Sequence, residues 1–189
     1  MQKKTESKGN LIMNKTQIHG AIRKMAGQIV ADFSPIDGVV MIGIRTRGAD
    51  LTRRLVNEIE GISGYRMQVG LIDTTFYRDD VMAFGPKPVM KKTEIPFDLM
   101  DERVILVDDV LYTGRTIRAA LDALMDFGRP KCIKLAVLID RGHRELPIQP
   151  DYVGKRLETS EAESVQVRLQ EEGEPDRVVI LPYPERVTW

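Results

Sequence analysis

The stretch that decides the fold runs from Val104 to Leu124 and reads VILVDDVLYTGRTIRAALDAL. An apolar run typical of a buried strand is followed by two aspartates, a hydroxyl-rich turn and the spacing of an amphipathic helix. The first N–H groups of a helix, with the side chains of Thr113 and Thr116, suit a phosphate. Asp108 and Asp109 can accept hydrogen bonds from vicinal sugar hydroxyls. The stretch therefore predicts a site that binds both halves of a ribose 5-phosphate.

Patterns typical of strands and helices alternate on both sides of this stretch. The predicted helices are residues 15–33, 48–60 and 114–127, and the predicted strands are residues 38–44, 67–73, 104–107 and 133–139. This alternation predicts an α/β fold, with a mostly parallel central sheet flanked by helices and binding loops at the carboxyl ends of the strands. Asn14 and Gln17 have the spacing of a capping box at the start of the first helix. Beyond Asp140, two short strand patterns, 165–169 and 177–181, flank the turn-rich sequence EEGEPD and predict a hairpin in a small C-terminal lobe.

Length and composition fit a single globular domain. The chain has 189 residues, enough for one substantial core. Its 28 basic residues equal its 28 acidic residues in number, so any RNA site must be a local patch. Cys132 is the only cysteine, and no stretch is apolar enough to span a bilayer or to act as a secretion signal, so we expect a cytoplasmic protein without a membrane partner. Residues 1–13 lack a pattern, and we expect them to be disordered.

The segment 104–116 resembles the signature with which type I phosphoribosyltransferases bind phosphoribosyl pyrophosphate (PRPP), in which hydrophobic residues precede two acidic ones and a T-G-x-T-like turn follows. Three further segments, GIRTRG at 43–48, FYRDD at 76–80 and DRGHRELPI at 140–148, resemble the pyrimidine operon attenuation proteins, regulators that are also uracil phosphoribosyltransferases. The resemblance extends over about residues 14–182. It is therefore a resemblance of nearly the whole chain.

This resemblance implies a type I phosphoribosyltransferase fold in a single domain, residues 14–189. The domain would have a core of about residues 14–140, a hood of about residues 141–189 and a flexible flap of about residues 74–100. The implied enzyme makes UMP and pyrophosphate from uracil and PRPP, with Mg²⁺ as cofactor. The implied regulator binds the leader RNA of a pyrimidine operon and senses UMP in the same pocket. A regulator with little catalytic activity and a phosphoribosyltransferase for another base are the alternatives, and a homodimer or higher homo-oligomer is expected.

The resemblance implies that the acidic pair and the turn after it bind the ribose 5-phosphate. Asp108 and Asp109 would hold the ribose hydroxyls, directly or through a Mg²⁺ ion that the substrate brings. The 5-phosphate would be held by Val110, Leu111, Tyr112, Thr113, Gly114, Arg115 and Thr116. Charge separates between the sugar and the departing pyrophosphate, so electrostatic stabilisation is the main catalytic requirement. Asp108, Asp109 and Arg47 are accordingly the expected catalytic residues.

The second loop, residues 45–48, also follows a strand and opens a helix. Taken alone, two arginines around a threonine are more typical of a solvated turn. The resemblance makes this segment the pyrophosphate loop, with contacts from Thr46 and Arg47, and such loops tend to carry a non-proline cis peptide. The flap would add Arg78 or Lys87, although composition alone favours a disordered insertion there.

Base and RNA contacts are implied near the end of the core. Arg141 and the backbone near Tyr152 and Val153 would recognise uracil, and the alternative is an ordinary solvated turn. The basic residues available for RNA are Arg23, Lys24, His143, Arg144, Lys155 and Arg156. Because the net charge is zero, the case for RNA is more modest than the case for catalysis.

Overall fold

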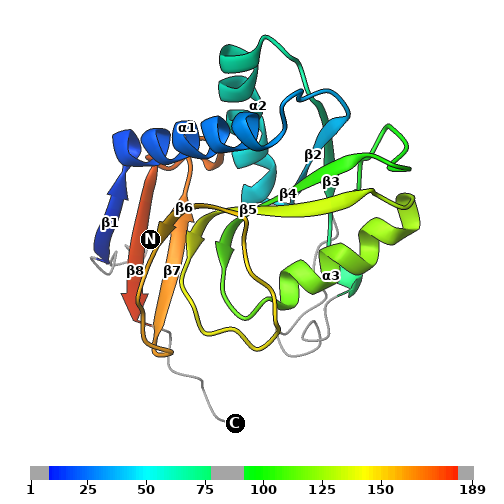
Figure 1. Cartoon of the computed structure of the whole chain (residues 1–189). Helices are drawn as coiled ribbons and strands as arrows, with labels where there is room; N and C mark the ends of the chain where they lie inside the picture. The colour runs from blue at the N-terminus through cyan, green and yellow to red at the C-terminus, as the bar shows by residue number, and fades with distance from the viewer. Residues whose placement is uncertain (1–8, 78–91, 183–189) are drawn as a thin grey trace.

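The computed structural model describes residues 9–77 and 92–182, and its centre is a five-stranded parallel sheet (Figure 1). The strand order is β3, β2, β4, β5, β6, and each neighbouring pair is parallel. The bounds are β2 Val39–Ile44, β3 Gln68–Ile72, β4 Arg103–Leu111, β5 Cys132–Asp140 and β6 Tyr152–Arg156. The prediction of an α/β fold with a mostly parallel sheet is therefore confirmed.

Helices cover both faces of this sheet. The bounds are α1 Lys15–Asp32, α2 Arg47–Ser63 and α3 Arg115–Leu124, the last continued by the 3-10 turn η3 Met125–Phe127. Figure 1 shows α1 and α2 on one face and α3 on the other. Successive strand residues point to opposite faces, so Met41 packs with α1 and α2 whereas Ile42 packs with α3. Within the described residues, no helix is both long and apolar enough to cross a membrane.

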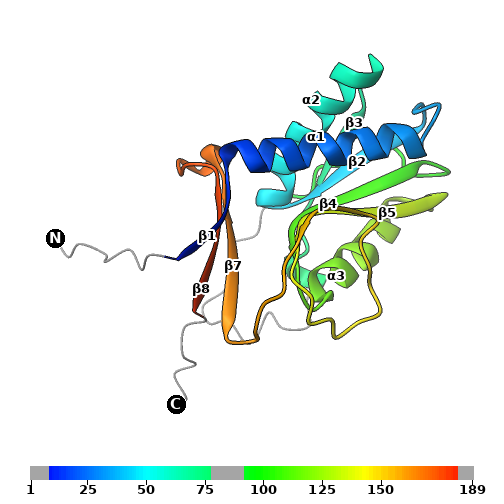
Figure 2. The same ribbon diagram turned by 60° about the vertical axis from the view of Figure 1, so that its left-hand side comes forward.

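A second, antiparallel sheet of three strands lies beside the first (Figure 2). Its order is β1, β8, β7, with bounds β1 Asn10–Asn14, β7 Glu163–Arg168 and β8 Arg177–Pro182. The pairing of β7 with β8 confirms the predicted hairpin, whose connection contains the 3-10 turn η4, Gln170–Glu172. β1 corrects the expectation of disorder through residue 13, because residues 10–14 pair with residues 177–180. The rest of that expectation, residues 1–8, lies outside the described residues.

Element boundaries agree with the sequence at the first helix and differ at two strands. The Asn14 side chain accepts the Gln17 N–H at 3.0 Å and the Gln17 side chain accepts the Asn14 N–H at 2.9 Å, which is the predicted capping box. β4 runs past the predicted end at Val107 to Leu111, because its pairing with β5 continues beyond the aspartates. β6 falls within the segment assigned to the hood, yet it pairs with β5 and extends the central sheet.

Candidate functional site

A pocket of about 350 Å³ lies at the carboxyl ends of β2, β3 and β4. Its lining comes from the end of β2 and the loop that leads into α2, from the residues after β3, from the end of β4, from the start of α3 and from η4. The lining residues are Ile44, Arg45, Thr46, Arg47, Asp73, Thr74, Thr75, Asp108, Asp109, Val110, Thr116 and Glu172. Six of these were predicted to bind PRPP: Thr46, Arg47, Asp108, Asp109, Val110 and Thr116. Binding at this edge of the sheet is typical of α/β folds.

The two aspartates near the end of β4 form the acidic side of the pocket. Asp108 is buried, and its Oδ1 accepts the backbone N–H of Asp109 at 2.9 Å. The guanidinium Nη1 of Arg47 lies 3.8 Å from Oδ2 of Asp109. Burial raises the pKa of Asp109, while Arg47 and the contact with Asp108 act in the opposite direction. Desolvated carboxylates of this kind are stabilised by a ligand that donates hydrogen bonds or brings a cation, such as a sugar diol with a divalent ion.

The turn between β4 and α3 is held in place by residues 140–148. The carbonyl of Thr113 accepts two backbone N–H groups of that segment, at 3.0 and 3.2 Å. The Arg144 guanidinium donates to the Tyr112 carbonyl at 2.8 Å and to the Asp140 carboxylate at 2.5 Å. The turn therefore rests on a layer of side-chain and backbone hydrogen bonds that fixes its shape.

Gly114 occupies the one position of the turn with positive φ, +94°. A side chain there would be strained, and its Cβ would lie 3.4 Å from the side chains of Leu146 and Ile148. The backbone N–H of Arg115 donates to Thr113 Oγ1 at 3.3 Å, so the helix starts directly at the turn. Five residues that were predicted to bind the 5-phosphate are not among those that line the 350 Å³ pocket: Leu111, Tyr112, Thr113, Gly114 and Arg115.

The loop after β2 brings the start of α2 against β4. Its Arg45–Thr46 peptide bond is cis, a feature that the resemblance implied and the sequence could not show. The α2 backbone reaches β4 at Gly48, where a Cβ would lie 2.5 Å from the carbonyl oxygen of Val107 and 3.2 Å from the Cα of Asp108. Glycine at this position therefore allows the loop and the acidic pair to share one pocket.

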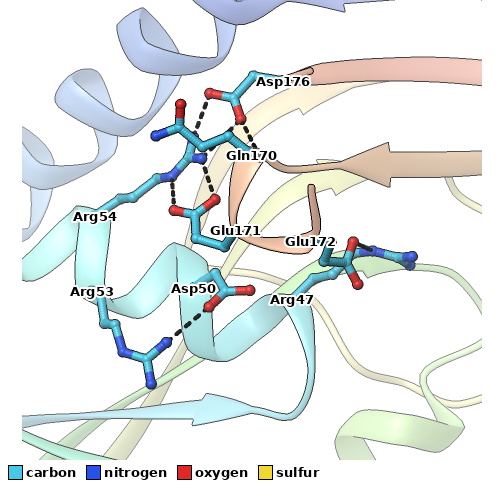
Figure 3. Close-up of polar contacts among 8 residues, drawn as sticks. All are labelled: Arg47, Asp50, Arg53, Arg54, Gln170, Glu171, Glu172 and Asp176. Atoms are coloured by element: carbon cyan, nitrogen blue, oxygen red, sulfur yellow. Dashed lines mark hydrogen bonds and ion pairs between the residues drawn. The ribbon is translucent and has the colours of Figure 1, made fainter. Parts of the chain in front are cut away.

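Arg47 lies between the carboxylates of Glu172 and Asp109. Its Nε donates to Oε2 of Glu172 at 2.8 Å (Figure 3), and its Nη1 faces Asp109. Burial opposes the charge of the guanidinium, but the hydrogen bond to Glu172 and the charge of Asp109 outweigh it and raise the pKa of Arg47. Arg47 is therefore a permanent cation in the pocket.

Sequence reasoning missed several lining residues. Arg45 belongs to the predicted pyrophosphate loop, but no role was predicted for it. Its guanidinium pairs with Glu94 at 3.2 Å, and its Nε is buried without a hydrogen-bond partner among the described residues. Asp73 follows β3 directly, and its carboxylate accepts the N–H of Thr75 at 2.9 Å. A polar residue at a strand end was the available signal for Asp73. No local signal marks Glu172, which is 125 positions from Arg47.

The predicted flap is described only at its two ends. The turn η1, Thr75–Tyr77, follows β3, and Glu94 pairs with Leu71 through two backbone hydrogen bonds of 2.8 and 2.7 Å. Arg78 and Lys87 lie outside the described residues. Their contact with pyrophosphate stays a prediction.

The residues predicted to recognise the base are not among those that line the 350 Å³ pocket. Arg141 is 3% exposed, and its guanidinium lies 4.1 Å from the centroid of the Tyr112 ring. It also donates to Thr159 Oγ1 at 3.2 Å and to the Ser160 carbonyl at 2.9 Å. Val153 lies on β6 and packs against the core on the α3 side of the sheet. Both assignments stay predictions.

The residues predicted to contact RNA divide into two groups. Arg23, Lys24, Lys155 and Arg156 are exposed, the first two on α1 and the others on β6, and α1 packs beside β6. His143 and Arg144 are half-buried and hydrogen-bonded inside the protein: His143 Nε2 lies 2.6 Å from the Thr159 carbonyl, and Arg144 holds the turn after β4. The geometry favours a structural role for Arg144.

Solved structures of phosphoribosyltransferases have the same fold as this chain. A hypoxanthine phosphoribosyltransferase of Trypanosoma cruzi superposes with a TM-score of 0.71 at 17% identity, covering 93% of this chain and 97% of that one. One from Staphylococcus aureus gives a TM-score of 0.67 at 18% identity, covering 95% and 94%. At this level of identity the similarity establishes the fold alone.

The family model for the phosphoribosyl transferase domain matches residues 12–172, so the chain belongs to the phosphoribosyltransferase family. Curated relatives place it more narrowly. A protein of Pelotomaculum thermopropionicum is 51% identical over 174 residues, covering 92% of this chain and 96% of the relative, and one of Deinococcus radiodurans is 49% identical over 170 residues, covering 90% and 93%. Both bear the name Bifunctional protein PyrR, and this chain is a member of that PyrR group. The family resemblance expected from the sequence is confirmed.

Proposed function

We propose that the protein transfers the ribose 5-phosphate group of PRPP to N1 of uracil, releasing pyrophosphate and forming UMP. The observation that carries this proposal is the meeting of the acidic pair, the phosphate turn and the Arg45–Arg47 loop at one edge of the sheet. Membership of the phosphoribosyltransferase family supports the transfer chemistry. We infer uracil as the base because the chain belongs to the PyrR group and its sequence resembles regulators that are also uracil phosphoribosyltransferases.

Each part of the pocket has a role in this reaction. Asp108 and Asp109 accept hydrogen bonds from the ribose hydroxyls, and the turn that ends at Thr116 holds the 5-phosphate. These two contacts fix the sugar, so its anomeric carbon faces the incoming base. Positive charge then develops on the ring while negative charge moves to the departing pyrophosphate. The Arg47 guanidinium stabilises that negative charge.

The residues present fit a Mg²⁺ ion that the substrate brings. The described residues contain no group of three or more acidic, histidine or cysteine side chains able to hold a metal by themselves. Mg²⁺ commonly uses one or two carboxylates together with substrate phosphates, and Asp108 and Asp109 line the pocket. When bound, the ion would neutralise charge on the pyrophosphate.

Radiolabelled uracil with PRPP and Mg²⁺ tests the proposal, and labelled UMP is the expected product. Asp109→Asn should reduce kcat/KM at least about tenfold, because one charge-assisted hydrogen bond contributes about 1.5 kcal/mol or more. Use of orotate or a purine in place of uracil would contradict the substrate assignment. No transfer to any base, with leader RNA still bound, would favour a regulator with little catalytic activity.

We also propose that the protein binds pyrimidine-operon leader RNA in a UMP-dependent way. The supporting observation is that Arg23 and Lys24 are exposed on α1, that Lys155 and Arg156 are exposed on β6, and that α1 packs beside β6, in a chain of zero net charge. Two copies in a homo-oligomer would double this surface. A cytoplasmic location is part of the same proposal.

The RNA test is a gel shift of the organism's own leader RNA across a salt series. UMP should tighten the complex, and Arg23→Gln with Lys155→Gln should weaken it. The same pair of substitutions should also make the binding constant less dependent on salt. In a plot of log K against log salt concentration, the slope should become shallower by about one for each phosphate that is no longer neutralised. Absence of any shift at low salt would remove the regulatory function and leave the enzyme intact.

A further inference from the structure

One ion pair connects the second sheet to the pocket. Glu172 belongs to η4, in the connection between β7 and β8, and its carboxylate lines the pocket. It accepts the Nε–H of Arg47, the first residue of α2, at 2.8 Å (Figure 3). The carboxylate of Glu172, a residue of the hairpin, is thus paired with the Arg47 guanidinium, which is proposed to bind the pyrophosphate.

The connection that carries Glu172 is anchored independently of Arg47. Arg54 donates to both carboxylate oxygens of Glu171 at 2.8 and 2.5 Å, and to both of Asp176 at 2.8 Å (Figure 3). Asp176 is almost wholly buried, and it also accepts the backbone N–H of Gln170 at 2.8 Å. These contacts fix the connection on α2, so Glu172 stays near the pocket whether or not Arg47 is bound to it.

A pyrophosphate group at Arg47 conflicts with this arrangement. It carries several negative charges and favours the N–H donors of this guanidinium, of which the Nε–H is bound to Glu172. Several carboxylates lie close together here: burial is the main cause that raises the pKa of nearby Asp50, the charges of Glu171 and Glu172 add to it, and Arg53 and Arg54 act in the opposite direction. A diphosphate ligand at Arg47 therefore approaches the charge of Glu172 and competes with it for the guanidinium, whereas a ligand that lacks a diphosphate leaves the pair intact.

We propose that Glu172 is a positioning residue that holds Arg47 in the pocket and competes with the pyrophosphate group for it, so that it sets the affinity for PRPP and pyrophosphate separately from the affinity for UMP. The inference rests on the role proposed for Arg47. Glu172 keeps the guanidinium beside Asp109 before substrate arrives. It also limits how tightly pyrophosphate is retained after transfer.

The test compares the wild type with Glu172→Gln by calorimetric titration of Mg²⁺-pyrophosphate and of UMP, and by steady-state kinetics with PRPP. Loss of one partly exposed ion pair should lower the Kd for pyrophosphate and the KM for PRPP about two- to fivefold. The Kd for UMP should stay within about twofold, because UMP has no group at Arg47. Unchanged or weaker pyrophosphate binding would overturn the inference, and so would equal changes for both ligands with a lower Tm, which indicate a purely structural pair.

Three variants complete the design. Glu174→Gln removes the same charge from the same connection, but Glu174 pairs with Arg168 and Arg177, so all constants should match the wild type. Glu172→Asp keeps the charge and should restore values near the wild type; values like those of Glu172→Gln would contradict competition by charge. Arg47→Gln separates the two proposals: if it abolishes pyrophosphate binding while Glu172→Gln changes nothing, only this inference fails. If neither variant alters pyrophosphate binding, the role of Arg47 fails as well.

Discussion

Replacement of Arg54 by methionine should destabilise the fold by removing the anchor between α2 and the connection from β7 to β8. The variant keeps an unbranched apolar stem like that of arginine and suits a helix, but leaves the Asp176 carboxylate, 3% exposed, without its cation. Removing one partner of a buried ion pair costs about 3–5 kcal/mol, and we expect about 2–3 kcal/mol here because Arg54 and Glu171 are 18% and 32% exposed. Urea unfolding at pH 7 measures this difference without screening the charges.

The same variant should change how stability depends on pH. Hydrogen bonds from Arg54 lower the pKa of Asp176 and of Glu171 in the folded protein. A carboxyl with a lowered folded pKa stabilises the fold above its unfolded pKa, about 3.9 for Asp and 4.3 for Glu, and this contribution is lost as the pH falls through the folded value. The stability difference between wild type and variant should therefore be constant from about pH 7 to 5 and shrink below about pH 4. A difference below about 1 kcal/mol at pH 7, or one that persists undiminished at pH 3, would refute this account of the anchor.

Three further changes have expected outcomes. Gly48→Ala places a methyl group 2.5 Å from the Val107 carbonyl oxygen, so urea unfolding should show a loss of about 1–3 kcal/mol, and kcat/KM should fall because α2 moves away from the acidic pair. Gly114→Ala forces a side chain to φ +94°, which costs about 1–3 kcal/mol and should weaken UMP binding in a titration; unchanged binding would mean that the turn does not hold the phosphate. Tyr152→Phe removes the 2.9 Å hydrogen bond to Asp32, and thermal unfolding should show a loss of about 0.5–1.5 kcal/mol.

Much of the fold was predictable because local patterns and tertiary structure agree. The first helix has apolar residues on one face and a capping box at Asn14, and both features appear in the structure. The buried strands β2 and β5 read as apolar runs, since helices cover both faces of the sheet. The end of β4 was misplaced because Asp108 and Asp109 interrupt the apolar pattern, although the backbone continues to pair with β5.

The remaining features depend on contacts between distant segments. β1 is a short strand whose partner is β8, more than 160 positions away, and nothing near Asn10 marks the pairing. Glu172 reaches Arg47 only because the hairpin folds back onto α2. The basic cluster after β5 looked available for ligands, yet Arg144 donates to backbone carbonyls and to Asp140, a role that sequence composition does not distinguish from RNA contact.

The most direct test of the central claim is a crystal structure of the protein with UMP bound. The account predicts the phosphate of UMP in the turn of residues 110–116, within hydrogen-bond distance of its backbone N–H groups, and the ribose hydroxyls facing Asp108 and Asp109. UMP bound elsewhere, with that turn and the two aspartates making no contact to it, would contradict the claim.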